Sequence, residues 1–181
     1  MPTVFLSPST QEYNPFITGN GNEEYWMNLI TDAMIPFLDA SGVAWSRNDP
    51  SGTVSNSIAM SNAGKYNLHL AIHSNASPES TPGMFRGPNV YYYATSQEGR
   101  RAADIIAANM RTIYPIPDLV ITVPNTTLSE LRRTVAPTVL VEVAYHDNWE
   151  DANWIQNNVE SIAQALARSV TEFLGVPFVT P

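Results

Sequence analysis

The sequence predicts a single α/β domain with a largely parallel sheet. Three observations support this fold class. The chain has 181 residues, which suits one domain with a substantial core. Its 44% hydrophobic and 14% charged residues are typical of a globular protein and exclude a disordered one. Strand signals and helix signals then alternate along the chain, without repeats, low-complexity tracts or linker-like segments.

Short runs of β-branched and aromatic residues between turn signals predict the strands. Pro8 stops the first of these runs, and the last one, within "APTVLVEVAYHDN", contains four aliphatic β-formers. The strands are predicted at Thr3 to Ser7, Val43 to Arg47, Asn67 to His73, Asn89 to Thr95, Leu119 to Val123 (a short edge strand) and Thr138 to Ala144.

Apolar residues at helical spacing, together with capping residues, predict the helices. Asn22 and Ser96 are candidate N-caps, Asp147 and Glu150 have the spacing of a capping box, and Gly175 is a C-terminal signal. The helices are predicted at Glu23 to Ala40, Thr53 to Ala63, from Ser96 to about Pro115, at Leu128 to Arg133, just after Asp147, and at about Asn158 to Leu174.

The composition limits the possible partners. A net charge of −8 leaves no basic patch for phosphates, so nucleic acid is not expected as the main partner. The chain contains no cysteine, which excludes disulfides and thiolate metal sites. No run approaches the roughly 18 apolar residues of a spanning helix, so we expect no membrane insertion. The start, "MPTVFLSPST", lacks the features of a signal peptide.

One carboxylate interrupts an otherwise apolar strand. Glu142 lies within "VLVEVAY", where a charge costs free energy unless it is paired, bound to a metal or placed at an opening. Two interpretations are open from this residue alone. Glu142 either pairs with a nearby arginine or hydroxyl group, or it serves an active site.

In such sheets ligands bind outside the carboxyl ends of the parallel strands. The rule selects Ser7 to Tyr13, the start of the Glu23 helix, His73 to Ser77, Thr95 to Gln97 and Glu142 to Asn148. A histidine at this edge is a possible metal ligand or a structural residue. His69, four residues before His73, is too far along an extended strand to bind the same metal, and we expect it to be structural.

Two adjacent acids begin the first helix, at Glu23 and Glu24. Acids are common in a first helical turn because they compensate the helix dipole. One of the two can point outward while the other points toward the end of the sheet. The apolar stripe of the helix does not decide which one does so, because neighbouring helical positions differ by about 100°.

The motifs "VFLSPS", "EEYWMNLI", "LAIHSNA" and "PTVLVEVAYHDN" occur in an order that resembles the zinc-dependent N-acetylmuramoyl-L-alanine amidases of type 3. The resemblance extends from Val4 to about Gly175 and is greatest to the Firmicute enzymes of sporulation and phage lysis. It implies a twisted, mostly parallel six-stranded sheet flanked by helices, with residues 1–181 forming a single catalytic domain.

The resemblance also implies roles for individual residues. Glu24, which stands four residues before Asn28, matches the family's glutamate zinc ligand, and His73 in "AIHSNA" matches its histidine ligand. Glu142 matches the catalytic glutamate that acts as general base on a zinc-activated water. The implied reaction cleaves the amide between N-acetylmuramic acid and L-alanine in peptidoglycan.

The first metal motif departs from the family pattern. The family has Asp-Pro-Gly-His after its first strand, whereas this chain reads "SPSTQE" and places Thr10 where the histidine ligand belongs. A catalytic zinc normally has three protein ligands and a water. His146 is our first candidate for the third ligand and Glu12 the second, because imidazole suits zinc well.

Three further residues are candidates for binding the substrate. Gln11 is a poor zinc ligand but can bind substrate or water, and Asn75 can donate to the substrate or hold the His73 loop. Arg132, in "LSELRRT", can contact a stem-peptide carboxylate, support Glu142 or form a plain surface salt bridge. We interpret the aromatic run "VYYYAT" as core and sheet-face packing.

Two other functions remain open at this point. A non-catalytic homologue would keep the groove and bind peptidoglycan without cutting it, and the missing histidine favours it. A metal-free glycosidase would pair Glu142 with Asp147 or Glu24 and release reducing sugar ends. Whether the chain is an amidase or a glycosidase, we expect its synthesis in the cytoplasm without a signal peptide. We expect it to act on the cell wall after lysis or release.

Overall fold

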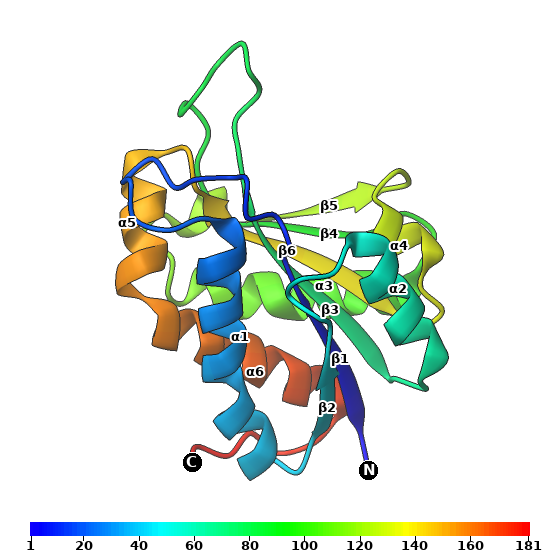
Figure 1. The fold of residues 1–181 in the computed structure, drawn as a ribbon. Coiled ribbons are helices and arrows are strands. Elements are labelled where there is room, and N and C mark those ends of the chain that lie inside the picture. The colour runs from blue at the N-terminus through cyan, green and yellow to red at the C-terminus, as the bar shows by residue number, and fades with distance from the viewer.

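A computed structural model describes residues 1–181 and contains one six-stranded sheet in the order β2-β1-β3-β6-β4-β5 (Figure 1). The α/β class, the six strands and the mostly parallel sheet are confirmed. The strands are β1 (Thr3–Pro8), β2 (Ala44–Arg47), β3 (Leu68–Asn75), β4 (Asn89–Tyr93), β5 (Ile121–Asn125) and β6 (Thr138–Tyr145). The helices are α1 (Glu23–Ala40), α2 (Val54–Ala63), α3 (Gln97–Arg111), the 3₁₀ turn η1 (Pro117–Leu119), α4 (Ser129–Arg133), α5 (Trp149–Asn157) and α6 (Val159–Leu174).

The pairing of β4 with β6 is antiparallel, whereas the other strand pairings are parallel. β4 and β5 therefore run opposite to β1, β3 and β6, and their carboxyl ends lie at the other edge of the sheet. The expectation that Thr95 to Gln97 joins the site edge is wrong for this reason. The side chain of Ser96 instead caps α3 by accepting from the Gly99 amide at 2.9 Å.

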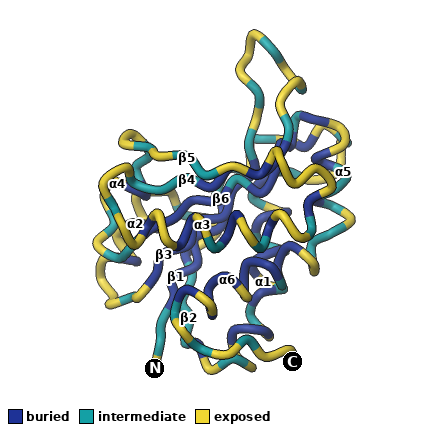
Figure 2. The backbone as a smooth tube through the Cα atoms, turned by 180° about the vertical axis from the view of Figure 1, so that it is seen from behind, coloured by how far each residue is buried: buried dark blue, intermediate teal, exposed yellow.

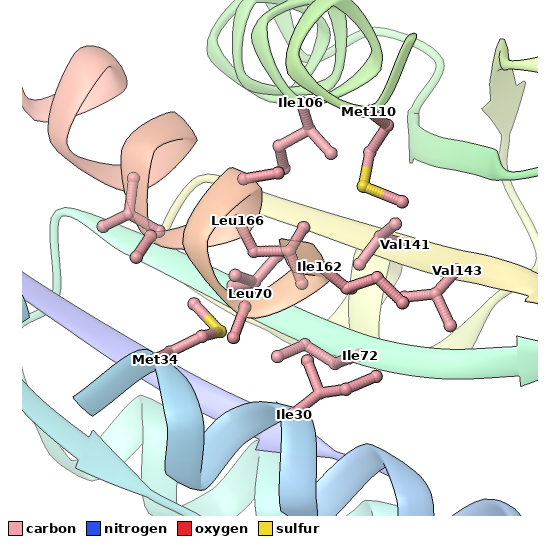
Figure 3. Packing of buried hydrophobic residues seen from close by; sticks show 14 of the residues in the cluster. Ile30, Met34, Leu70, Ile72, Ile106, Met110, Val141, Val143, Ile162 and Leu166 are labelled. Carbon is pink, nitrogen blue, oxygen red and sulfur yellow. The ribbon is translucent and has the colours of Figure 1, made fainter. Parts of the chain in front are cut away.

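The two faces of the sheet are covered very differently. One face packs against α1, α3, α5 and α6 and forms a continuous core of 34 buried residues. Figure 3 shows Leu70, Ile72, Val141 and Val143 of the sheet meeting side chains from α1, α3 and α6. On the other face, where α4 packs, the apolar cluster contains only Ala71, Leu131 and Leu140. Ser7, His69, His73 and Glu142 of the sheet lie on this second face.

The helix ends follow their predicted caps in most cases. The side chain of Asn22 accepts from the Tyr25 amide at 2.8 Å, and Gly175 ends α6 with a φ of 71°, a left-handed conformation that glycine adopts without strain. The predicted capping box at Asp147 and Glu150 is wrong. Asn148 caps α5 by accepting from the Asp151 amide at 3.1 Å, and Asp147 has another role.

That role is to hold the loop between β3 and β4, residues 76–88, which projects from the end of the molecule (Figure 1). Asp147 Oδ2 accepts from the amides of Ser77 at 3.0 Å and Gly83 at 2.8 Å. Asp151 holds the base of the loop by accepting from the Gly87 amide at 2.8 Å. Figure 2 shows that the outer part of this loop is largely exposed.

No helix in the protein combines the length and the apolarity needed to cross a membrane.

We expect Asp151→Ala to lower the free energy of unfolding by about 3–5 kcal/mol in urea denaturation. Asp151 is fully buried and accepts from the Gly87 and Tyr145 amides and from the Tyr114 hydroxyl, all of which would lose their acceptor. Asp118→Ala, at an exposed position of η1, is the control and should change stability by less than about 0.5 kcal/mol. Equal effects of the two substitutions would contradict this account of the loop anchor.

Candidate active site

Strand alternation places Ser7, His69, His73 and Glu142 on the thinly covered face. Successive side chains of a strand point to opposite faces, so His69 and His73, four residues apart, share one face. The strand register then pairs His73 with Glu142 on β6. Glu142 is thus presented beside His73 although apolar residues surround it in the sequence.

A cleft of about 510 Å³ opens over these residues. Its walls are the end of β1 with the loop that follows, the start of α2 and the start of α4. The residues that line it are Ser7, Pro8, Ser9, Thr10, Gln11, Tyr13, Gly52, Thr53, Val54, Ser57, His73, Leu128, Ser129, Glu130, Leu140 and Glu142. The cleft therefore lies at the sheet edge that the sequence predicted, where β3 and β6 approach their carboxyl ends.

His73 lies between two carboxylates. Its Nδ1 is 3.0 Å from Glu23 Oε1, and its Nε2 is 3.3 Å from Glu130 Oε2. Burial alone would lower the pKa of His73, but the contacts with Glu130 and Glu23 raise this pKa well above the usual 6.5. In this arrangement the ring is an imidazolium that donates to one acid from each nitrogen.

The acid that reaches His73 from the first helix is Glu23, whereas the sequence pattern selected Glu24. Glu23 is 2% exposed and also accepts from Asn14 Nδ2 at 2.7 Å. Burial would raise the pKa of Glu23, but the hydrogen bonds from His73 and Asn14 lower it. The side chain of Glu24 is turned the other way and accepts from Asn28 Nδ2 at 3.1 Å.

Sequence reasoning missed Glu130, the second acid on His73. Glu130 is 2% exposed, and its Oε1 lies 3.0 Å from His69 Nε2 and accepts from the Ser7 hydroxyl. Burial would raise the pKa of Glu130, but His69 and His73 hold it well below its usual range. The signal that could have found Glu130 was the two histidines on one strand face, because buried ring N–H groups need acceptors.

Glu142 has no hydrogen-bond partner for its buried Oε2 atom. Burial is the main reason that the pKa of Glu142 is raised to about 7, with Glu23 and Glu130 adding repulsion and His73 opposing it. The sequence left open that an arginine or a hydroxyl group pairs with Glu142, but neither contacts this oxygen. A partnerless carboxylate with a pKa near neutrality, set in the wall of a cleft, is suited to accepting and returning protons.

Two donors here have the chemistry of a zinc site. Glu23 and His73 bring a carboxylate oxygen and an imidazole nitrogen together, and both groups bind zinc in proteins. A third ligand is missing, because no group of three His, Asp or Glu side chains is arranged to hold a metal ion. Thr10, in the position of the family's first histidine, lines the cleft with a hydroxyl group.

The structure does not bring either candidate for the third ligand to this pair. His146 Nδ1 is bonded to the Ser74 hydroxyl at 2.9 Å, and the ring stacks on Phe16 with centroids 5.8 Å apart. Burial lowers the pKa of His146, so its ring is neutral near pH 7. Glu12 is exposed in the turn after β1 and does not line the cleft.

The three predicted substrate-binding residues lie in different places. Gln11 lines the cleft, where its Oε1 accepts from Asn14 at 3.0 Å. Asn75 ends β3, and its Oδ1 accepts from the Ala76 amide at 2.9 Å. Arg132 is exposed and lines a separate shallow pocket with Tyr93 and Thr134. His69 is buried in a hydrogen-bond network with Ser61 and Glu130.

Known proteins share this sequence pattern and fold. The sequence profile of a family described as N-acetylmuramoyl-L-alanine amidase matches residues 10–172. The chain is 28% identical over 172 residues to N-acetylmuramoyl-L-alanine amidase LytC of Bacillus subtilis (strain 168). The match covers 91% of this chain and 34% of that protein, so the chain spans about a third of the length of this curated relative.

Solved structures of similar fold include an N-acetylmuramoyl-L-alanine amidase from Clostridium difficile 630, with a TM-score of 0.85 and 16% identity over 96% of this chain and 97% of that one. The catalytic domain of CwlV from Bacillus (Paenibacillus) polymyxa var. colistinus has a TM-score of 0.83 and 19% identity, covering 98% of this chain and all of that domain. The CD27L endolysin catalytic domain has a TM-score of 0.74 and 20% identity, covering 95% and 97% of the two chains. At these identities the likeness establishes the fold, and the profile match over most of the sequence establishes the family: the chain belongs to the N-acetylmuramoyl-L-alanine amidases of type 3.

Proposed function

We propose that this chain hydrolyses the amide between N-acetylmuramic acid and L-alanine in peptidoglycan, with Glu142 as the general base. The observation that carries the proposal is Glu142 itself, whose buried Oε2 lacks a partner in the cleft wall and whose pKa is about 7. Membership of the amidase family supports the choice of bond. Action on the cell wall follows from that substrate.

The residues of the cleft have separate tasks in this reaction. Glu142 takes a proton from the attacking water and returns it to the leaving amine of L-alanine, so the carboxylate is regenerated at the end of the cycle. His73 lies beside Glu142 across the β3–β6 pairing, and in the metal-free protein its charge favours the ionised form of Glu142. A zinc held by neutral His73 would supply this positive charge instead. Gln11 lines the same cleft and is our candidate for orienting the substrate or the water.

Zinc is the metal that family membership implies. The residues that would hold it are Glu23 and His73, and a bound zinc would polarise the scissile carbonyl and acidify the attacking water. The proposal prefers Glu23 to Glu24, which the sequence pattern selected, because Glu23 is the acid that contacts His73. His146 and Glu12 stay predictions for the third ligand, without a contact to this pair.

Asn75 and Arg132, the other two candidates for substrate binding, lie outside the cleft. Asn75 lies at the end of β3 and can donate to a substrate that extends past the cleft toward the loop of residues 76–88. Arg132 lies outside the cleft, so a contact with a stem-peptide carboxylate would require the peptide to extend to the Tyr93 pocket. Both remain proposals.

The two-carboxylate glycosidase finds little support in the geometry. Asp147 is held by the amides of Ser77 and Gly83, and Glu24 is held by Asn28. Neither acid lines the cleft with Glu142. The non-catalytic homologue remains the outcome to expect if the chain binds peptidoglycan but releases no new amine.

We expect Glu142→Gln to reduce the release of free alanine amines from purified peptidoglycan by on the order of 10²–10⁴-fold, because the amide cannot take the water proton. The assay labels new amino groups by dinitrophenylation and counts reducing sugar ends in parallel, which should not increase. The matched control is Glu160→Gln, an exposed position of α6, which should keep the parent rate. A loss smaller than about tenfold in Glu142→Gln would rule out this base.

The same substitution should stabilise the protein at alkaline pH. The pKa of Glu142 is about 7 in the folded state and close to the usual 4.5 in the unfolded chain, so the stability of the parent falls as pH rises between these values. In chelator-treated protein we expect Glu142→Gln to raise the free energy of unfolding by roughly 1–3 kcal/mol at pH 8, with the gain vanishing near pH 4.5. A pH-independent difference in urea titrations would contradict the raised pKa.

Zinc content should distinguish the two adjacent acids of α1. We expect Glu23→Gln to hold much less zinc than the parent, as measured by plasma mass spectrometry on proteins purified without an affinity tag. Glu24→Gln removes the same charge one residue away and should retain the metal, because its carboxylate faces Asn28. Retention by Glu23→Gln together with loss by Glu24→Gln would restore the assignment from the sequence pattern.

A further inference from the structure

We propose that Glu130 is a positioning residue for His73, and this inference rests on the proposed function of the cleft. Glu130 holds the Nε2–H of His73 with one carboxylate oxygen, so that Nδ1 is the ring nitrogen directed to Glu23. A histidine that binds a metal commonly donates its other ring N–H to a carboxylate, which fixes the tautomer and the ring orientation. Glu130 is placed to do this here.

The carboxylate of Glu130 is shared among three partners on two strands. Its Oε2 faces His73, while its Oε1 accepts from His69 Nε2 at 3.0 Å and from the Ser7 hydroxyl. Ser7 lies on β1, and both histidines lie on β3. Because both oxygens are engaged, the carboxylate plane cannot rotate without breaking a buried hydrogen bond, and the position of the His73 ring is fixed in turn.

His69 completes the orientation from the other side. Its Nδ1 is 2.8 Å from the Ser61 hydroxyl on α2, which can donate to that nitrogen and leave Nε2 to carry the proton toward Glu130. His69 is fully buried and stacks on Phe5 with ring centroids 5.2 Å apart. This gives a role to a histidine that is too distant along β3 to share a metal with His73.

The backbone that carries Glu130 is itself anchored. Leu131, the next residue, packs with Ala71 and Leu140, and the Glu130 carbonyl accepts from the Thr134 hydroxyl at 2.5 Å. Before α4, the side chain of Asn125 accepts from the Leu128 amide at 2.8 Å. Glu130 therefore reaches His73 from a segment that is held at both ends.

The test compares Glu130→Gln with Glu130→Ala, each folded as judged by circular dichroism. The Gln variant keeps the shape of the side chain but has a single acceptor oxygen for His69, His73 and Ser7. The first readout is a ¹⁵N–¹H correlation spectrum of the histidine rings, which reports which nitrogen of His73 carries the proton. We expect Nε2–H alone for neutral or metal-bound His73 in the parent and a mixture of both tautomers in the variants.

The second readout is kinetic and thermodynamic. We expect kcat on peptidoglycan fragments and zinc affinity, measured against a chromophoric chelator, each to fall about 10–100-fold, with KM changing little. Glu160→Gln controls for a lost surface charge and should keep the parent kcat. Asp151→Asn is the second control, because it removes a buried carboxylate that does not contact Glu130 or the histidines. The His73 spectrum of this variant should match that of the parent.

Two results would overturn the inference. One is a His73 spectrum in Glu130→Gln identical to that of the parent, and the other is an unchanged kcat and zinc affinity in that variant. A different result would refute the proposed function without refuting this inference. An inactive parent whose His73 tautomer still depends on Glu130 would refute the amidase proposal and leave the positioning role intact.

Discussion

The site depends on one buried cation placed among three acids. His73 is held between Glu23 and Glu130, and Glu142 lies opposite it in the cleft. A single imidazolium can compensate two carboxylates only in part, so Glu23 and Glu130 stay ionised while burial and their repulsion raise the pKa of Glu142 to about 7. A divalent cation at this position would change the balance and allow all three acids to ionise.

The same balance separates the site from the parts of the protein that stabilise the fold. The core of 34 buried residues lies between the sheet and the helices α1, α3, α5 and α6, on the face away from the cleft. Glu142, in contrast, leaves a buried oxygen without a partner, which is unfavourable for folding. Groups that are unfavourable for folding are common at active sites, and the role proposed for Glu142 agrees with this.

Much of the fold could be predicted because local signals and the overall pattern agree. Asn22 and Gly175 mark helix ends by capping chemistry that acts within a few residues. The antiparallel direction of β4 could not be read from its own residues, since a strand's orientation is decided by the element it pairs with.

The sequence could predict which types of residue form the candidate site and where in the fold they lie. It could not predict which individual side chains contact one another. His73 and Glu142 were selected because a histidine at the carboxyl end of a strand and a carboxylate within an apolar strand are both readable in the sequence. The choice between Glu23 and Glu24 depends on the rotation of α1 against the sheet, which the sequence pattern does not define. Glu130 was missed because its partners, His69 and His73, are more than 50 positions away in the sequence and meet it only in the folded chain.

The thin layer over the cleft has a consequence for how the cleft wall is held. The layer that includes α4 is joined to the sheet by a three-residue apolar cluster and by the hydrogen bonds of Glu130 and Ser61. Because its buried apolar contacts with the sheet are few, this layer depends on polar contacts for its position. Loss of one of these polar partners would therefore disturb the wall of the cleft, while the helices on the opposite face keep the sheet intact.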